Sequence, residues 1–209
     1  MLTTDTKTDR FLAELTPYVT TNLHGPFPAH LICHPPGLTE DQRAERRNTA
    51  RHEAAHFVAS RACHGSTVHR VFVHPTGNTK KGYVGRVQSA EVYVEETLFV
   101  ILAGVEWEAL HPEGDPIRSN GDAHDAEHIQ HPDKKAIARA TRAFLIENHR
   151  LVESVALAFM ALCRKDGHMG DNRLRKVAKW ARGALLETQG YEPRGLNLCS
   201  SPPLSRQAC

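Results

Sequence analysis

The feature that most constrains the fold is a long helix expected between Thr39 and His64. Thr39 is a favourable N-cap residue, Gln42 stands three residues later, and two acidic residues occupy the first turn, as is typical of a helix start. Apolar side chains then recur at helical spacing, which predicts that one face of the helix is apolar. Gly65 follows directly and favours a helix end at His64.

The residues after this helix predict an antiparallel strand pair and then further helices. β-branched and aromatic residues at 68–74 and 82–87 are typical of strands, and a Pro-Thr-Gly-Asn turn begins at Pro75. Gly85, inside the second strand, indicates a bulge or a close approach of the backbone to another group. Helical patterns follow, and they cover residues 90–110, 122–130, 133–164 and 171–188. The expected fold class is therefore α+β, predominantly α-helical, with a small antiparallel strand pair.

The two ends of the chain are expected to differ from this main domain, which spans residues 39–188. Residues 1–38 are predicted to form an irregular lead-in, because prolines between Pro26 and Pro36 prevent a continuous helix or central strand. A short amphipathic piece around Phe11 to Leu15 precedes those prolines. The tail, residues 189–209, carries Pro-Arg-Gly and Ser-Ser-Pro-Pro and is predicted to be disordered.

Composition narrows the class of function. The chain of 209 residues has 26 basic and 24 acidic side chains, and a net charge of +2 argues against a protein that coats nucleic acid or an anionic membrane. Its longest apolar run, Leu98 to Val105, is far shorter than the roughly 20 residues of a membrane-spanning helix. No secretory signal is visible, and five scattered cysteines without a C-x-x-C pair are typical of reduced thiols. We therefore expect a cytoplasmic protein that binds neither nucleic acid nor a membrane.

The residues His52-Glu53-Ala54-Ala55-His56 form an H-E-x-x-H motif within the first helix. Residues at i and i+4 share one helix face, so the two imidazoles can converge on one Zn²⁺. The glutamate beside the first histidine can then take a proton from a zinc-activated water without being a ligand itself. The motif predicts one catalytic zinc per chain, with His52 and His56 as ligands and Glu53 as the base.

A catalytic zinc needs a third protein ligand and one position for water. The candidates are acidic residues and the later histidines, and the acidic ones are Glu106, Glu108, Asp115, Asp122 and Asp125. Glu108 lies on a predicted helix, as the third ligand does in His₂Glu proteases, whereas Asp125 begins a helix behind a glycine-containing loop. Spacing alone does not choose between them.

A second metal motif overlaps one of these candidates. Residues His124 to His128 read H-x-x-E-H, the inverted zinc-protease signature. The sequence beyond it offers few acidic residues for a distant third ligand, with Glu187 and Glu192 nearly the last. We therefore expect the main site at H-E-x-x-H.

Four segments, in order, resemble the peptidase domain of FtsH-type ATP-dependent zinc metalloproteases. They are the H-E-x-x-H segment at 50–59, a strand with its Pro-x-Gly turn and returning strand at 68–84, a glycine-containing helix with an acidic pair at 102–110, and the loop 119–126. The resemblance covers about residues 45–188. It implies that residues 39–188 form a zinc metalloprotease domain.

This resemblance implies a ligand set and a way to bind substrate. It implies zinc ligands His52, His56 and Asp125, with Glu53 as the base and Glu108 as a supporting residue near the site. The strand residues Val71, Phe72 and Val73 would offer a free edge that pairs with an extended polypeptide substrate. The implied function is a zinc endopeptidase that hydrolyses peptide bonds through a zinc-activated water.

The departures from the family modify this expectation. No G-x-x-x-x-G-K-[ST] motif is present, so the ATPase module that unfolds substrates is missing from this sequence. The expected enzyme is soluble and ATP-independent, and it cleaves flexible or unfolded segments; a homo-oligomer or an unfoldase acting in trans stays open. Ala55 stands where the family has glycine, and His124 where it has a small polar residue. The alternatives are a non-catalytic, zinc-stabilised peptide-binding or regulatory module, and a protease of another zinc class.

Two predicted helices carry clusters of basic side chains. One cluster lies between Arg43 and Arg51, and the other lies between Arg173 and Arg182 around Trp180. Both are interpreted as solvated helix faces rather than nucleic-acid sites.

Overall fold

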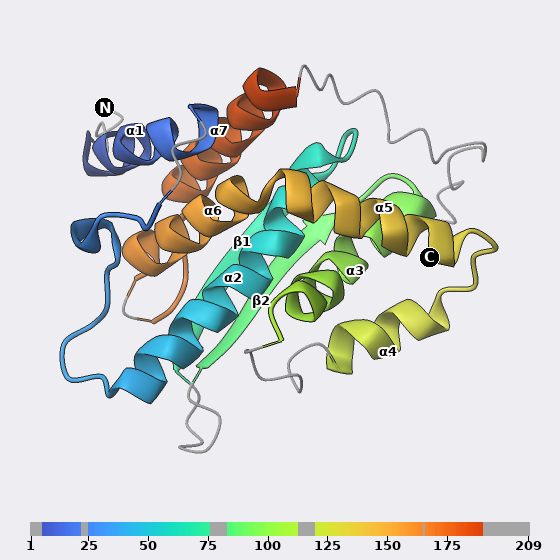
Figure 1. The fold of residues 1–209 in the computed structure, drawn as a ribbon, viewed down its shortest axis with the longest axis horizontal. Coiled ribbons are helices and arrows are strands. Elements are labelled where there is room, and N and C mark those ends of the chain that lie inside the picture. The colour runs from blue at the N-terminus through green and yellow to red at the C-terminus, as the bar shows by residue number, and fades with distance from the viewer. Residues whose placement is uncertain (1–5, 22–24, 76–82, 113–119, 165, 190–209) are drawn as a thin grey trace.

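The computed structural model describes residues 6–21, 25–75, 83–112, 120–164 and 166–189 (Figure 1). Helices dominate it, and two antiparallel strands form its sheet, so the predicted fold class of a mostly helical α+β chain is confirmed at this level. The elements in chain order are α1 (Thr6–Thr20), a short 3₁₀ turn (Ala29–Leu31), α2 (Glu40–Ala62), β1 (Thr67–Pro75), β2 (Tyr83–Ala90), α3 (Val94–Leu110), α4 (Asn120–His128), α5 (Lys134–Glu147), α6 (His149–Leu162) and α7 (Asp171–Gln189).

Helix α2 is the centre of the fold. Thr39 begins it with a capping box: the Thr39 hydroxyl accepts a hydrogen bond from the Gln42 backbone at 3.2 Å, and the Thr39 backbone donates to the Gln42 side chain at 3.0 Å. From Thr49 to Ala62 nearly every residue of the helix is buried, because α3, α6 and both strands pack against it. The prediction of this helix and its start is confirmed.

Strand β1 lies between two partners. On one side it pairs with β2, in a register that places Val71 opposite Val87 and Val73 opposite Gly85. On its other side, the backbone N–H of Val73 donates to Gly167 at 2.9 Å, and the N–H of Met169 donates to Val71 at 3.0 Å.

This arrangement corrects one expectation from the sequence. The edge at Val71, Phe72 and Val73, expected to be free for substrate, is occupied by residues 167–169 of the chain itself. Gly167 makes this possible, because it has a positive φ of 82° and a Cβ there would lie 2.2 Å from the Cβ of His74. The sequence distance between the two segments explains why the pattern did not reveal the pairing.

The N-terminal segment also differs from the expectation of an irregular lead-in. Residues 6–20 form α1, whose buried side chains Leu12, Leu15 and Val19 face the core. This helix packs against α6 and α7, and the Trp180 indole donates a hydrogen bond to the Thr16 hydroxyl at 3.0 Å. The amphipathic segment is therefore longer than the short piece predicted from the sequence. The prolines from Pro26 to Pro36 interrupt regular structure only after this helix.

One long helix expected over 133–164 is two helices in the structure. The break lies at Asn148, where the backbone leaves helical geometry and the side-chain amide donates to the Phe144 carbonyl at 2.9 Å. Asparagine favours such local hydrogen bonds over helix continuation. The predicted disordered tail beyond Gln189 lies outside the described residues.

Among the described helices, none combines the length and the hydropathy that a membrane crossing requires.

Candidate metal centre

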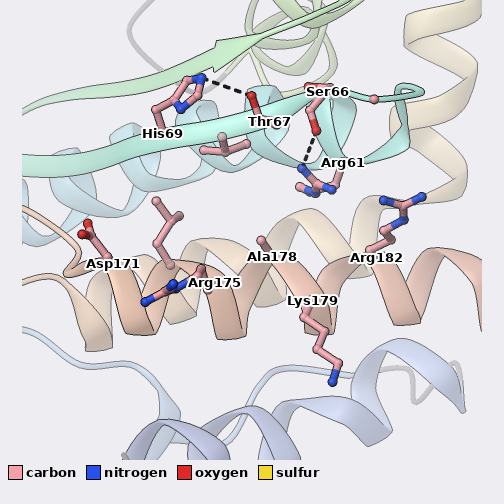
Figure 2. Close-up of a pocket in the computed structure, with 12 residues that line it drawn as sticks. Arg61, Ser66, Thr67, His69, Asp171, Arg175, Ala178, Lys179 and Arg182 are labelled. Carbon is pink, nitrogen blue, oxygen red and sulfur yellow. Dashed lines mark hydrogen bonds between the residues drawn. The ribbon is translucent and has the colours of Figure 1, made fainter. Parts of the chain in front are cut away.

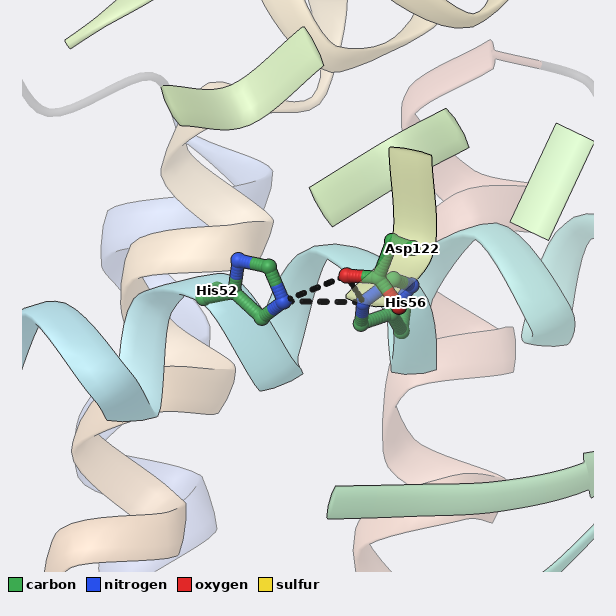
Figure 3. Close-up of side chains that lie close together, drawn as sticks. All are labelled: His52, His56 and Asp122. Atoms are coloured by element: carbon green, nitrogen blue, oxygen red, sulfur yellow. Dashed lines mark hydrogen bonds and ion pairs between the residues drawn. The ribbon is translucent and has the colours of Figure 1, made fainter. Parts of the chain in front are cut away.

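His52 and His56 lie one turn apart on the inner face of α2. Their Nε2 atoms are 3.1 Å apart, and the residues are only 6% and 8% exposed (Figure 3). The apolar environment comes from alanines on the same helix, since Ala54 and Ala55 are fully buried. The motif residues therefore share one face, as their spacing predicts.

Asp122, near the start of α4, completes the group. Its Oδ2 atom lies 2.9 Å from Nε2 of His52 and 3.1 Å from Nε2 of His56 (Figure 3). Ligand atoms at about 2.0–2.1 Å from a tetrahedral zinc are separated by roughly 3.3 Å, so the three atoms lie close to the positions that a shared ion requires. Within the described part of the chain this is the one group of three such side chains that could hold a metal ion.

The second nitrogen of each ring is held by helix α3. Nδ1 of His56 donates to the Val100 carbonyl at 2.7 Å, and Nδ1 of His52 donates to Oε1 of Glu108 at 2.9 Å. A carbonyl oxygen can only accept, so Nδ1 of His56 carries a proton, and Nε2 is the nitrogen that can bind a metal once it is deprotonated. The Glu108 carboxylate favours the same tautomer for His52.

Gly104 gives the two rings their space. A Cβ at this position would lie 2.5 Å from Nε2 of His56 and 2.6 Å from Cε1 of His52, a separation that no side chain tolerates. Val100, Gly104 and Glu108 are spaced at i, i+4 and i+8, so they form one stripe of α3 along the histidine face of α2. The donor set, the ring orientations and the space beside them fit a bound metal ion.

Glu53 lies next to the histidines on α2, with its side chain against strand β2. The side chain is buried, with 6% exposure of the residue, and it receives a hydrogen bond from the backbone of Val87. Gly85 admits it, because a Cβ there would lie 2.4 Å from Cγ of Glu53. The close approach that Gly85 indicated in the sequence is therefore the approach of this carboxylate.

The electrostatics of the metal-free group follow from burial and hydrogen bonding. Burial acts against a charged His52, but hydrogen bonds to Asp122 and Glu108 outweigh it and raise the pKa of His52 from 6.5 to about 10. Burial likewise opposes the charged form of His56, whose pKa is nevertheless raised by the hydrogen bond to Asp122. The two histidines lower the pKa of Asp122 against the effect of its burial. Burial raises the pKa of Glu53, in spite of both neighbouring imidazoles.

The structure brings together most, but not all, of the predicted site residues. His52, His56 and Glu53 are adjacent, and Glu108 accepts a hydrogen bond from His52. Asp125, which the resemblance implied as the third ligand, is exposed on α4 and is not part of the group. Asp122, one of the candidates that spacing left open, takes the position beside the histidines, because the first turn of α4 is the part that faces them.

The other candidates lie elsewhere. The Glu106 carboxylate accepts a hydrogen bond from Arg142 at 3.5 Å, and Asp115 falls outside the described residues. His124 and His128 of the inverted motif have their Nε2 atoms 2.9 Å apart, but both residues are exposed and neither belongs to the group of three.

Sequence reasoning predicted Glu108 but missed the contributions of Val100 and Gly104 on α3. The Val100 carbonyl has no sequence signal, since every residue carries one. Gly104 did carry a signal, as a glycine inside an otherwise apolar helix, which often marks a close approach.

Compared with models of protein families, with curated proteins and with solved structures, the chain matches none of them.

Proposed function

We propose that this protein is a zinc-dependent endopeptidase. The observation that carries the proposal is the convergence of His52 Nε2, His56 Nε2 and Asp122 Oδ2 within 3.1 Å of one another. Two imidazoles and one carboxylate are a donor set typical of catalytic zinc, which leaves a fourth position for water. The H-E-x-x-H motif and the resemblance to FtsH-type peptidases support the same interpretation.

The roles of the residues follow from their positions. His52, His56 and Asp122 would hold the ion, while Val100 and Glu108 keep the ring nitrogens oriented toward it. A zinc ion bound there would supply Lewis-acid polarisation of a water and of the scissile carbonyl. Glu53 would accept a proton from that water and deliver it to the leaving amine. Its raised pKa suits the first of these transfers, because a carboxylate with a raised pKa is a stronger base toward the water proton.

Substrate binding would use β2 rather than β1. Both edges of β1 have partners at Val71–Val73, whereas β2 pairs with β1 alone among the described strands, and Glu53 lies against its residues Gly85 and Val87. An extended polypeptide that adds to this edge would pass beside the proposed base and the metal ligands. Backbone pairing reads side chains weakly, so flexible or unfolded segments are the expected substrates.

The experiment is cleavage of an unfolded protein by zinc-loaded wild type and Glu53→Gln, with zinc measured in both. We expect Glu53→Gln to lower cleavage by at least about 100-fold while the protein retains one zinc per chain, because the base is removed and the ligands stay. Glu127→Gln is the matched control: Glu127 is exposed on α4 and would be the base of the inverted motif. Loss of cleavage in Glu127→Gln and not in Glu53→Gln would overturn the proposal.

One observation favours a second candidate, a zinc-stabilised peptide-binding module. Helix α4 packs against α3 and buries the apolar side chain of Ala126, and Asp122 connects this helix to α2. A metal at this point would fasten α4 to the centre of the fold. Wild type that binds one zinc per chain and captures unfolded polypeptide without cleaving it would favour the binding module.

A further inference from the structure

A second candidate site lies apart from the metal centre, beside the start of β1. An open cavity of about 810 Å³ is bordered by the end of α2, the start of β1 and helix α7 (Figure 2). We call it the basic groove and define it by Arg61, Ser66, Thr67, Arg175, Lys179 and Arg182. None of these residues belongs to the metal centre.

The groove concentrates positive charge. Three arginines and one lysine line it, and Asp171 is the carboxylate among the lining residues. Because the whole chain has a net charge of only +2, this local excess is not a property of the surface in general. Arg175, Lys179 and Arg182 are exposed along α7, so the groove and its charges are open to solvent.

Arg61 gives the strongest indication that the groove binds an anion. Its Nη1 donates to the Ser66 carbonyl at 2.9 Å, but its buried Nε has no hydrogen-bond partner among the described residues. Burial lowers the pKa of Arg61, and the nearby charge of Arg182 lowers it further. Arg61 and Arg182 both line the groove, and an anion bound between guanidinium groups would be stabilised by charge-assisted hydrogen bonds.

The walls indicate the size and type of ligand. The cavity volume falls within the range of small-molecule sites, about 300–1,000 Å³. Val68, Leu174 and Ala178 add an apolar surface beside the guanidinium groups, and Leu174 is itself buried. A planar or apolar moiety can lie on this surface while a phosphate group meets the arginines, whose fork of N–H donors matches phosphate oxygens.

We propose that the basic groove binds a phosphorylated small molecule of nucleotide size. A nucleic acid would need a longer row of cations to follow many phosphates, and one groove of this volume accommodates one or two. The site goes beyond the proposed peptidase function and does not depend on it.

The test is titration of the full chain with ADP, with adenosine as the ligand that lacks phosphates. We expect ADP to bind at least about tenfold tighter than adenosine, because charge-assisted hydrogen bonds to arginine carry the interaction. Arg182→Gln should lower the affinity for ADP by roughly tenfold or more. The matched control Arg139→Gln, which removes an exposed arginine of α5, should leave the affinity for ADP unchanged. Binding of ADP at the metal centre would not respond to Arg182→Gln, so the comparison separates the two sites.

Several outcomes would overturn this assignment. They are the absence of ADP binding at millimolar concentration in low salt, equal weakening by Arg182→Gln and Arg139→Gln, and tighter binding of a polyglutamate peptide or an oligonucleotide than of ADP. Thermal unfolding of both variants shows whether each remains folded. Because Arg182 is exposed, we expect both melting temperatures to stay near that of wild type.

Discussion

Oε1 of Glu108 lies 2.9 Å from Nδ1 of His52, across the interface between α3 and α2. Four residues earlier on α3, Gly104 lies against both rings, and four residues before that, the Val100 carbonyl accepts from His56. One stripe of α3 therefore orients both imidazoles. The proposed ligands come from α2 and α4, but the orientation of the two imidazoles is set by α3, which supplies none of the three proposed ligands.

The third ligand is tested by comparing Asp122→Asn with Asp125→Asn. We expect Asp122→Asn to lower zinc affinity by at least about 100-fold, because a carboxylate oxygen is replaced by a poorer donor, while Asp125→Asn binds zinc like wild type. Competition with a zinc-binding dye measures both affinities. The reverse order of the two variants would restore the ligand set implied by the resemblance to FtsH-type peptidases.

Glu108→Gln should weaken zinc binding by about 10- to 100-fold, since the carboxylate that orients His52 and increases its basicity is lost. Glu106→Gln is the control on the same helix, because Glu106 pairs with Arg142 rather than with a histidine. The same dye competition reports both. Equal affinities of the two variants would show that Glu108 does not support the ligand.

Gly104→Ala should abolish zinc binding and destabilise the protein by about 1–3 kcal/mol, because the added methyl group overlaps the histidine rings and α3 must move away. Gly183→Ala, in α7, is the matched control. A Cβ there meets no atom within 4 Å, so it should be neutral or should stabilise the helix by about 0.5–1 kcal/mol. Urea unfolding and zinc analysis check both effects, and normal zinc content in Gly104→Ala would contradict the proposed packing.

The metal-free protein should lose stability as the pH rises above about 6.5. The pKa of His52 is raised from 6.5 to about 10 in the folded state, so the stabilisation from its charged form is complete below 6.5 and is lost as the pH approaches 10. Zinc requires the deprotonated ring, so the increase in melting temperature caused by zinc should grow over the same interval.

Melting curves in chelator and in zinc between pH 6 and pH 10 measure this behaviour. The control is Asp122→Asn, which removes one of the two hydrogen bonds that raise the pKa of His52. The chelated variant should therefore lose less stability over the interval than chelated wild type. Parallel pH profiles of the two proteins would contradict the coupling.

Local signals in the sequence predicted most elements of the fold. The Thr39–Gln42 capping box, the strands β1 and β2 and the start of α7 all depend on residues close together in the chain. The sequence-based predictions were wrong where contacts with residues distant in the chain determine the local structure. The edge of β1 is taken by residues 167–169, and α1 becomes a helix through its packing on α6 and α7.

The candidate site divides in the same way. The i, i+4 spacing of His52 and His56 determines, from sequence alone, that both rings leave α2 on one side, because helix geometry is local. Only the tertiary structure decided that Asp122 rather than Asp125 meets them, since that depends on how α4 approaches α2 through α3. The same holds for Val100, whose carbonyl holds His56 only because two helices pack at this register. The spacing of residues in the sequence determines which side chains leave a helix on the same face. The packing between helices determines which partners those side chains contact.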